Sequence, residues 1–124
     1  MLLWRWVLLP GGGAMEITIG KARRSRLSDP LPGQVYVGRP SPLGNPFQLG
    51  RDGSRAEVIS RYRHWLWAQL QVPGSIQRRE LEQLLAQAKV GPLELLCWCA
   101  PLAFHAEVIR SALLWLEAQR RITA

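Results

Sequence analysis

The sequence contains little cysteine, and its apolar segments are short. Cysteine occurs twice in 124 residues, at Cys97 and Cys99, which excludes the dense disulfide frameworks that hold small secreted domains together. We therefore expect a cytoplasmic protein with reduced thiols. A chain of this length is expected to form one domain, and it can bury roughly two-thirds of its unfolded surface without disulfide bonds.

No apolar segment is long enough to cross a membrane. The most apolar stretch, residues 1–14, is interrupted by Arg5 and is too short to span a bilayer, so we predict no membrane partner. Met15 follows at once and begins a stretch with the pattern of an ordinary domain start. We interpret residues 1–14 as a non-conforming tail, such as an upstream start codon would add, and residues 15–124 as a single domain.

Lysine is scarce, whereas arginine is abundant. Lys21 and Lys89 are the only lysines among 16 basic residues, and the formal net charge is +7. Arginine binds phosphate and carboxylate groups through its planar guanidinium, so the excess fits an anionic ligand. A coding sequence rich in G and C accounts for the excess equally well. A basic chain also attracts nucleic acid, and these alternatives remain open at this point.

The apolar pattern predicts an α/β domain with about three strands and three helices packed on the sheet. Ser54 and Glu57 have the spacing of a capping box, which marks the start of the first helix. Ser75 is the expected cap of the second helix. The expected strands cover residues 16–22, 35–38 and 93–99, and the expected helices begin at Ser54, at Ser75 and near His105.

A long loop rich in glycine and proline follows the second expected strand, over residues 38–53 with the sequence GRPSPLGNPFQLGRDG. In α/β folds, ligands bind beyond the carboxyl ends of the strands, and long loops in compact domains are often functional. We predict a ligand pocket here. Arg39 and Arg55 are expected to hold an anion, and Gly44 and Asn45 to shape the loop and orient the ligand.

Phe47 lies in the same loop and allows two interpretations. Its ring is suited to stack on a planar ligand, or to pack into the core beneath an ordinary connecting loop. The tripeptide Gly44–Asn45–Pro46 does not decide between them.

A second candidate is the segment CWCAPLAFH, residues 97–105, where the third strand ends and the last helix starts. Cys97, Cys99 and His105 are three potential ligands for a soft metal, but structural zinc sites use four. Cys99 near a helix N-terminus and His105 also fit a thiolate nucleophile with a general base. Cysteines packed as small apolar residues, with His105 helping to cap the helix, are the simplest alternative, and it is the one we favour from spacing alone.

The two candidate segments meet if the second and third strands are adjacent and parallel. The carboxyl ends of parallel strands lie at one edge of a sheet, so Arg39, Asn45, Cys99 and His105 would then come together. This convergence is our prediction for the site.

The motifs also resemble a known family. Val37-Gly38-Arg39, then Gly44-Asn45-Pro46-Phe47, then Cys97-Trp98-Cys99-Ala100-Pro101 and His105, occur in an order similar to that of domain-of-unknown-function family 4326, which is bacterial and phage-related. The resemblance covers about Glu16 to the last helix. It implies no established activity.

The family pattern includes a further cysteine beside the histidine, which would complete a set of four zinc ligands. Phe104 stands at that position in this chain. The resemblance therefore leaves zinc binding by Cys97, Cys99 and His105 an open question.

Three functions fit the sequence. The first is a domain that binds a small anionic ligand such as a nucleotide, with Cys99 and His105 as catalytic residues if it is also an enzyme of nucleotide or modified-base metabolism. The second is a non-catalytic module that binds nucleic acid through its arginines. The third is an interaction module stabilised by a metal. We rank them in this order, and whether the protein is an enzyme stays undecided.

Overall fold

The computed structural model describes residues 6–8, 14–23, 30–98 and 105–123. Its sheet has four strands in the order β1-β2-β4-β3. Strands β2 (Ala14–Lys21) and β3 (Gln34–Tyr36) both pair in parallel with the central strand β4 (Leu93–Cys97). The short strand β1 (Trp6–Leu8) pairs antiparallel with the start of β2, with Val7 opposite Met15.

Three helices complete the described fold, and their ends follow the local sequence. Helix α2 (Arg55–Leu70) begins at Ser54, whose side chain accepts from the backbone N–H of Glu57 while the Glu57 carboxylate accepts from the backbone N–H of Ser54. Helix α3 (Ile76–Val90) begins at Ser75, whose side chain accepts from the backbone N–H of Arg78. Helix α4 is the longest and spans His105–Thr123. Such caps satisfy backbone donors that have no partner inside the helix.

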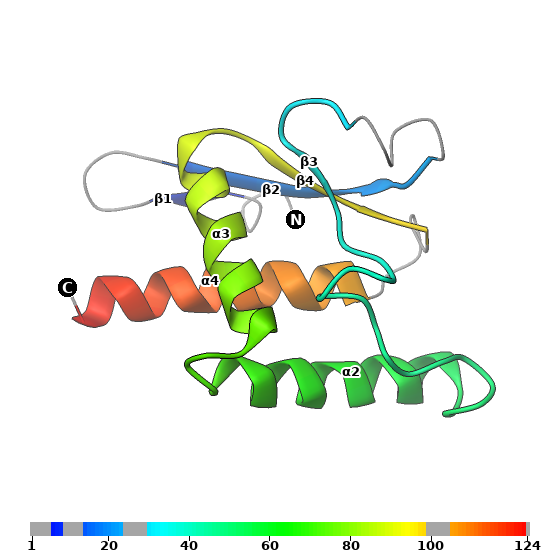
Figure 1. Ribbon diagram of the computed structural model, residues 1–124. Coiled ribbons are helices and arrows are strands. Elements are labelled where there is room, and N and C mark those ends of the chain that lie inside the picture. Colours follow the sequence, from blue (N-terminus) through cyan, green and yellow to red (C-terminus); the bar gives the residue numbers. More distant parts are fainter. Residues whose placement is uncertain (1–5, 9–13, 24–29, 99–104, 124) are drawn as a thin grey trace.

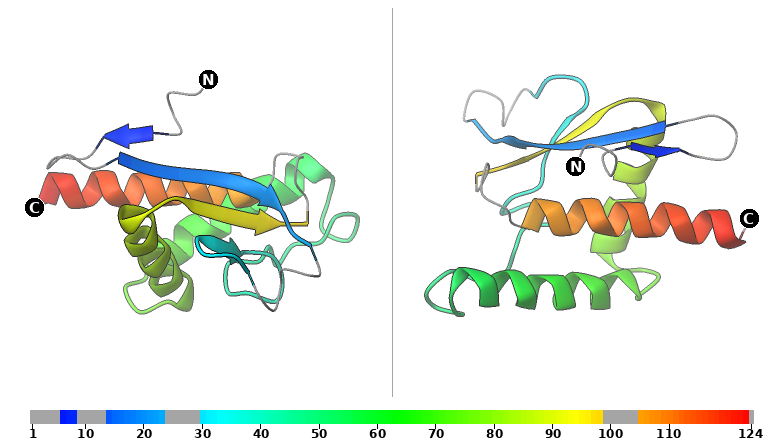
Figure 2. Two further views of the ribbon diagram at one scale, coloured as in Figure 1. Left: turned by 90° about the horizontal axis from the view of Figure 1, so that it is seen from above. Right: turned by 180° about the vertical axis from the view of Figure 1, so that it is seen from behind.

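The described helices lie on one side of the sheet in two layers. Helices α3 and α4 pack directly against the sheet, and α2 lies on their far side (Figure 1, Figure 2). Between the layers is a core of buried apolar residues from every layer, including Leu95 of β4, Leu85 of α3, Ile109 of α4 and Tyr62 of α2. Helix α2 thus packs mainly against α3 and α4, and these two helices separate it from the sheet.

The expected fold class is confirmed: the protein is α/β, with a parallel sheet of three strands and three helices. The structure adds β1, which falls within the stretch interpreted as a tail; the tail assignment itself stays a prediction. All three expected strands differ from the structure in their bounds. The strand expected at 16–22 is Ala14–Lys21. The strand expected at 35–38 is Gln34–Tyr36, and the one expected at 93–99 ends at Cys97, because the chain turns at Trp98.

Among the residues that the structure describes, no helix is both long and apolar enough to cross a lipid bilayer.

Candidate functional site at the carboxyl ends of β3 and β4

The carboxyl ends of β3 and β4 lie side by side. Tyr36 is in register with Leu96, and the backbone N–H of Val37 donates to the Leu96 carbonyl at 3.0 Å, so the pairing continues one residue beyond β3. The N-terminus of α4 lies at the same end of the molecule (Figure 1, Figure 2). The second and third expected strands are therefore adjacent and parallel, which is the condition for the predicted convergence of the two candidate segments.

The loop after β3 folds back on itself within a few residues. The backbone N–H of Ser41 donates to the Gly38 carbonyl, and the backbone N–H of Gly44 donates to the Ser41 carbonyl. Gly44 is buried, and a Cβ atom placed there would lie 2.8 Å from the backbone nitrogen of Arg39. Such a distance is too short for any side chain, so the close approach of the loop to Arg39 requires glycine at this position.

The rest of the loop is fixed to the core by Tyr62 of α2. The Tyr62 hydroxyl donates to the Leu43 carbonyl at 2.7 Å, and both residues are buried. The Tyr62 ring meets the ring of His105 edge-on, with centroids 5.4 Å apart. One side chain of the outer helical layer therefore joins the loop to the start of α4.

Asn45 and Phe47 both serve the internal structure of the loop. Asn45 Oδ1 accepts from the backbone N–H of Phe47 at 2.9 Å, which forms the short turn that asparagine side chains commonly make. The Phe47 ring is partly buried and packs against the core. This is the core position considered for Phe47 from the sequence, whereas ligand contact by Asn45 stays a prediction.

His105, the first residue of α4, connects three segments. Its Nε2 lies 3.1 Å from the carbonyl oxygen of Val37, and its Nδ1 lies 3.6 Å from Cys97 Sγ. Because a carbonyl oxygen can only accept, Nε2 carries the proton in this contact, and in the neutral ring Nδ1 accepts from the Cys97 thiol. His105 thus holds the end of β3, the end of β4 and the start of α4 together.

The charge state of His105 follows from its surroundings. The side chain is only 6% exposed, and burial lowers the pKa of His105 because the imidazolium loses its hydration. The hydrogen bond to Val37 opposes this shift, and the nearby positive charge of Arg39 adds to it. His105 is therefore neutral at neutral pH, and the exposed Arg39 is the positive charge beside it.

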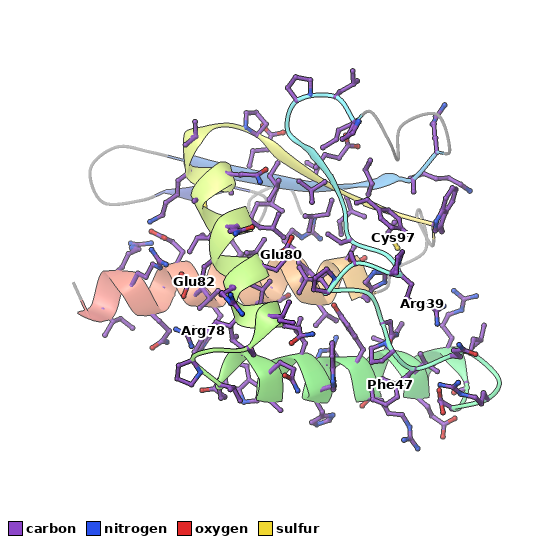
Figure 3. The ribbon with its side chains drawn as sticks, in the orientation of Figure 1. Arg39, Phe47, Arg78, Glu80, Glu82 and Cys97 are labelled. Carbon is purple, nitrogen blue, oxygen red and sulfur yellow. The ribbon has the colours of Figure 1, made fainter. Side chains whose placement is uncertain are left out.

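The histidine contact involves a different cysteine from the one chosen as nucleophile in the sequence analysis. Cys97 is 1% exposed, and its thiol lies against the His105 ring. Figure 3 labels Cys97 and Arg39 at this end of the sheet. Cys99 lies outside the described residues, and so does Phe104. Within the part of the chain that the structure describes, no group of three or more His, Cys, Asp or Glu residues is arranged to hold a metal ion.

An aromatic pair at this end of the sheet was missed in the sequence analysis. Trp98 directly follows β4, is 45% exposed, and meets the Tyr36 ring edge-on with centroids 6.5 Å apart. The Tyr36 hydroxyl donates to the Arg39 carbonyl at 2.6 Å. The position of Trp98 between two cysteines was the only signal in the sequence for this aromatic pair. The exposure of Trp98 could not be predicted, because it depends on β4 ending at Cys97. We call Arg39, Cys97, Trp98 and His105 the carboxyl-end site.

Arg55 stands apart from these residues. It is exposed at the start of α2, in the helical layer farthest from the sheet (Figure 1). Arg51 of the same loop pairs with Asp52 at 2.8 Å. Of the residues expected to bind ligand, the structure therefore brings Arg39 and Gly44 together, and it places Arg55 in another layer.

The comparisons with known proteins give a family. A family model described as Domain of unknown function (DUF4326) matches residues 20–115. The chain belongs to this family. The region matched to DUF4326 contains both the loop after β3 and the start of α4, and so all of the carboxyl-end site. No curated protein and no solved structure matches the chain.

Proposed function

We propose that this DUF4326 protein binds a small anionic ligand of the nucleotide type at the carboxyl-end site. The observation that carries the proposal is the position of Arg39: an exposed guanidinium at the carboxyl ends of two adjacent parallel strands, next to the N-terminus of a long helix. This is the place where open α/β sheets bind ligands, and both the guanidinium and the helix N-terminus favour a phosphate group.

The exposed Trp98 supports a ligand with a planar ring. Indole rings stack on nucleobases whatever the base, because every base has a π-face. Tyr36 connects Trp98 to Arg39, through a ring contact on one side and a hydrogen bond to the Arg39 backbone on the other. A nucleotide carries both a phosphate group and a base, joined through its sugar, so one such ligand has a group for Arg39 and a group for Trp98.

His105 and Cys97 have a positioning role in this proposal. Both are buried, and their contact holds the loop that carries Arg39 against the strand end that carries Trp98. A thiol next to an imidazole is also the pairing that nucleophilic enzymes use. The thiol next to the imidazole in the structure is that of Cys97, and Cys99 lies outside the described residues. Catalysis by Cys99 with His105 stays a second, separate part of the proposal, and product analysis of each bound nucleotide tests it.

The binding experiment is a thermal-shift panel of nucleoside mono-, di- and triphosphates, nucleosides and inorganic phosphate. We expect a nucleotide to raise the Tm of the wild-type protein. Arg39→Gln should remove the part of the shift that depends on phosphate, and Trp98→Ala the part that depends on the base. The control is Arg79→Gln, an exposed arginine on α3, which should respond as the wild type does.

The proposal is wrong if no nucleotide shifts the Tm, or if Arg39→Gln and Arg79→Gln respond alike.

A further inference from the structure

An apolar groove lies between α2 and α4, apart from the carboxyl-end site. Its volume is about 410 Å³, and none of its lining residues belongs to that site. We call it the interhelical groove. It is lined by Arg63, His64, Leu66, Trp67 and Leu70 of α2 and by Val108, Ser111, Ala112 and Trp115 of α4.

The groove is open because small side chains face large ones across the two helices. Ser111 and Ala112 leave space on α4, while Trp67 is 48% exposed and so does not fill it. The rings of Trp67 and Trp115 meet edge-on with centroids 4.8 Å apart. This geometry leaves indole surface facing the groove, where another aromatic ring can add an edge or face contact.

The lining determines the charge of the ligand. Arg63 and His64 are the ionisable residues among those that line the groove, and both are basic types. His64 Nδ1 lies 2.9 Å from the Ser60 carbonyl oxygen, so Nδ1 carries the proton and Nε2 of the neutral ring is an acceptor. The Arg63 guanidinium is therefore the donor that an anion would meet in this lining. A ligand that places its apolar body against the tryptophans therefore gains most by carrying a negative group at the Arg63 end.

The size of the groove favours a small molecule over a protein. Small-molecule sites range from about 300 to 1,000 Å³ and are mostly apolar with a few polar groups, as here. Stable protein interfaces bury about 800 Å² on each partner, which is far more surface than nine groove residues offer. We infer that the interhelical groove binds a flat aromatic anion, such as an aromatic carboxylate or sulfonate, independently of any nucleotide.

The test compares 1-naphthoate with 1-naphthamide, two probes of similar shape of which only the first is charged. Isothermal titration calorimetry measures affinity, and the NMR shifts of the Trp67 and Trp115 indole N–H groups report the location. We expect saturable 1:1 binding of naphthoate, roughly tenfold tighter than that of the amide, which corresponds to about 1.4 kcal/mol.

Three variants separate this site from nonspecific binding. Arg63→Gln should weaken naphthoate binding about fivefold to tenfold and leave the amide unaffected, as expected when one charge-assisted contact is lost. Arg61→Gln is the matched control, because Arg61 is exposed on the same helix but does not line the groove. Ala112→Phe should block both probes.

The inference is overturned if naphthoate does not saturate, if both probes bind equally, or if Arg63→Gln behaves like Arg61→Gln. None of these outcomes depends on Ala112→Phe folding correctly. Thermal shifts with nucleotides test the carboxyl-end site separately, so the two proposals succeed or fail independently.

Discussion

The carboxyl-end site and the interhelical groove differ in how their walls are held. At the carboxyl-end site, backbone carbonyls of Val37 and Leu43 accept from His105 and Tyr62, so the loop is fixed by buried polar contacts. In the groove, apolar side chains surround a space that nothing in the described structure fills. The first region has no room for an added methyl group at Gly44, whereas the second has room for a whole ring. Substitutions of similar size should therefore have opposite effects in the two regions.

The largest contrast is expected between two aromatic residues of α2. Tyr62 is fully buried and fixes the loop, whereas Trp67 is 48% exposed at the groove. Tyr62→Ala should lower the free energy of unfolding by about 3–5 kcal/mol, the usual loss for a buried aromatic residue. Trp67→Ala should cost about 1 kcal/mol, because much of its surface is already in water. Urea denaturation of both variants measures the difference, and equal losses would contradict the comparison.

Gly44→Ala should be the next most damaging change. The added methyl group would meet the Arg39 backbone, which cannot move aside as a flexible side chain can. Overpacking of this kind typically costs about 1–3 kcal/mol. Gly74→Ala is the matched control, since a Cβ there has no atom within 4 Å. We also expect Gly44→Ala to weaken nucleotide binding, because Arg39 is the residue displaced. If the two variants are equally stable, the loop is not closely packed against Arg39.

The pH dependence of stability should report on His105. Burial lowers its pKa in the folded state, so the unfolded chain binds the proton more readily. The free energy of unfolding should then fall as the pH drops below about 6.5, by up to about 1.4 kcal/mol per pH unit until the folded-state pKa is reached. Above pH 6.5 this contribution is fully present.

Chemical denaturation between pH 5 and 8 measures this slope, and two histidine variants assign it. His105→Gln should reduce the slope, and His64→Gln, which changes an exposed histidine, should retain it. An unchanged slope in His105→Gln would show that another group is responsible.

The smallest effect is expected from filling the groove. Ser111 is exposed and lines the groove, so Ser111→Leu should add apolar contacts with Trp115 on the same helix and with Leu66 across the groove. We expect a gain of about 0.5 kcal/mol from burial and from the better helix propensity of leucine. A Tm higher than that of the wild type, with weaker naphthoate binding, would support this comparison with Gly44→Ala. A clear loss of stability would mean that the groove is closed in solution.

Much of the fold was predictable because its signals are local. Ser54 with Glu57 marks the start of α2, and four buried residues of α3, Leu81, Leu84, Leu85 and Ala88, follow the helical period. The predicted ends of the strands were less accurate, because the pairing with neighbouring strands determines where each strand ends. Trp98 continues the apolar run of β4 in the sequence, yet the chain turns there.

The candidate site was predictable only in outline. Adjacent parallel strands after a long loop indicate where residues converge, and the family match supports the limits of that region. The contact of Cys97 with His105 depends on where β4 ends, and the spacing of the two cysteines does not show which of them lies next to the histidine. The interhelical groove could not be predicted at all, because the relative rotation of α2 and α4 determines whether Ser111 and Ala112 face Trp67 or solvent.

The position of β4 in the sheet also affects the order of events during synthesis. Strands β2 and β3 do not pair with each other; each pairs with β4, which follows them in the sequence and is the last of the strands that the structure describes. The ribosome must therefore synthesise β4 before any parallel pairing can begin, and until then the edges of β2 and β3 that face β4 have no partner strand. Long-range pairing of this kind is slow and exposes nascent chains to aggregation. Expression should accordingly benefit from conditions that slow translation or supply chaperones.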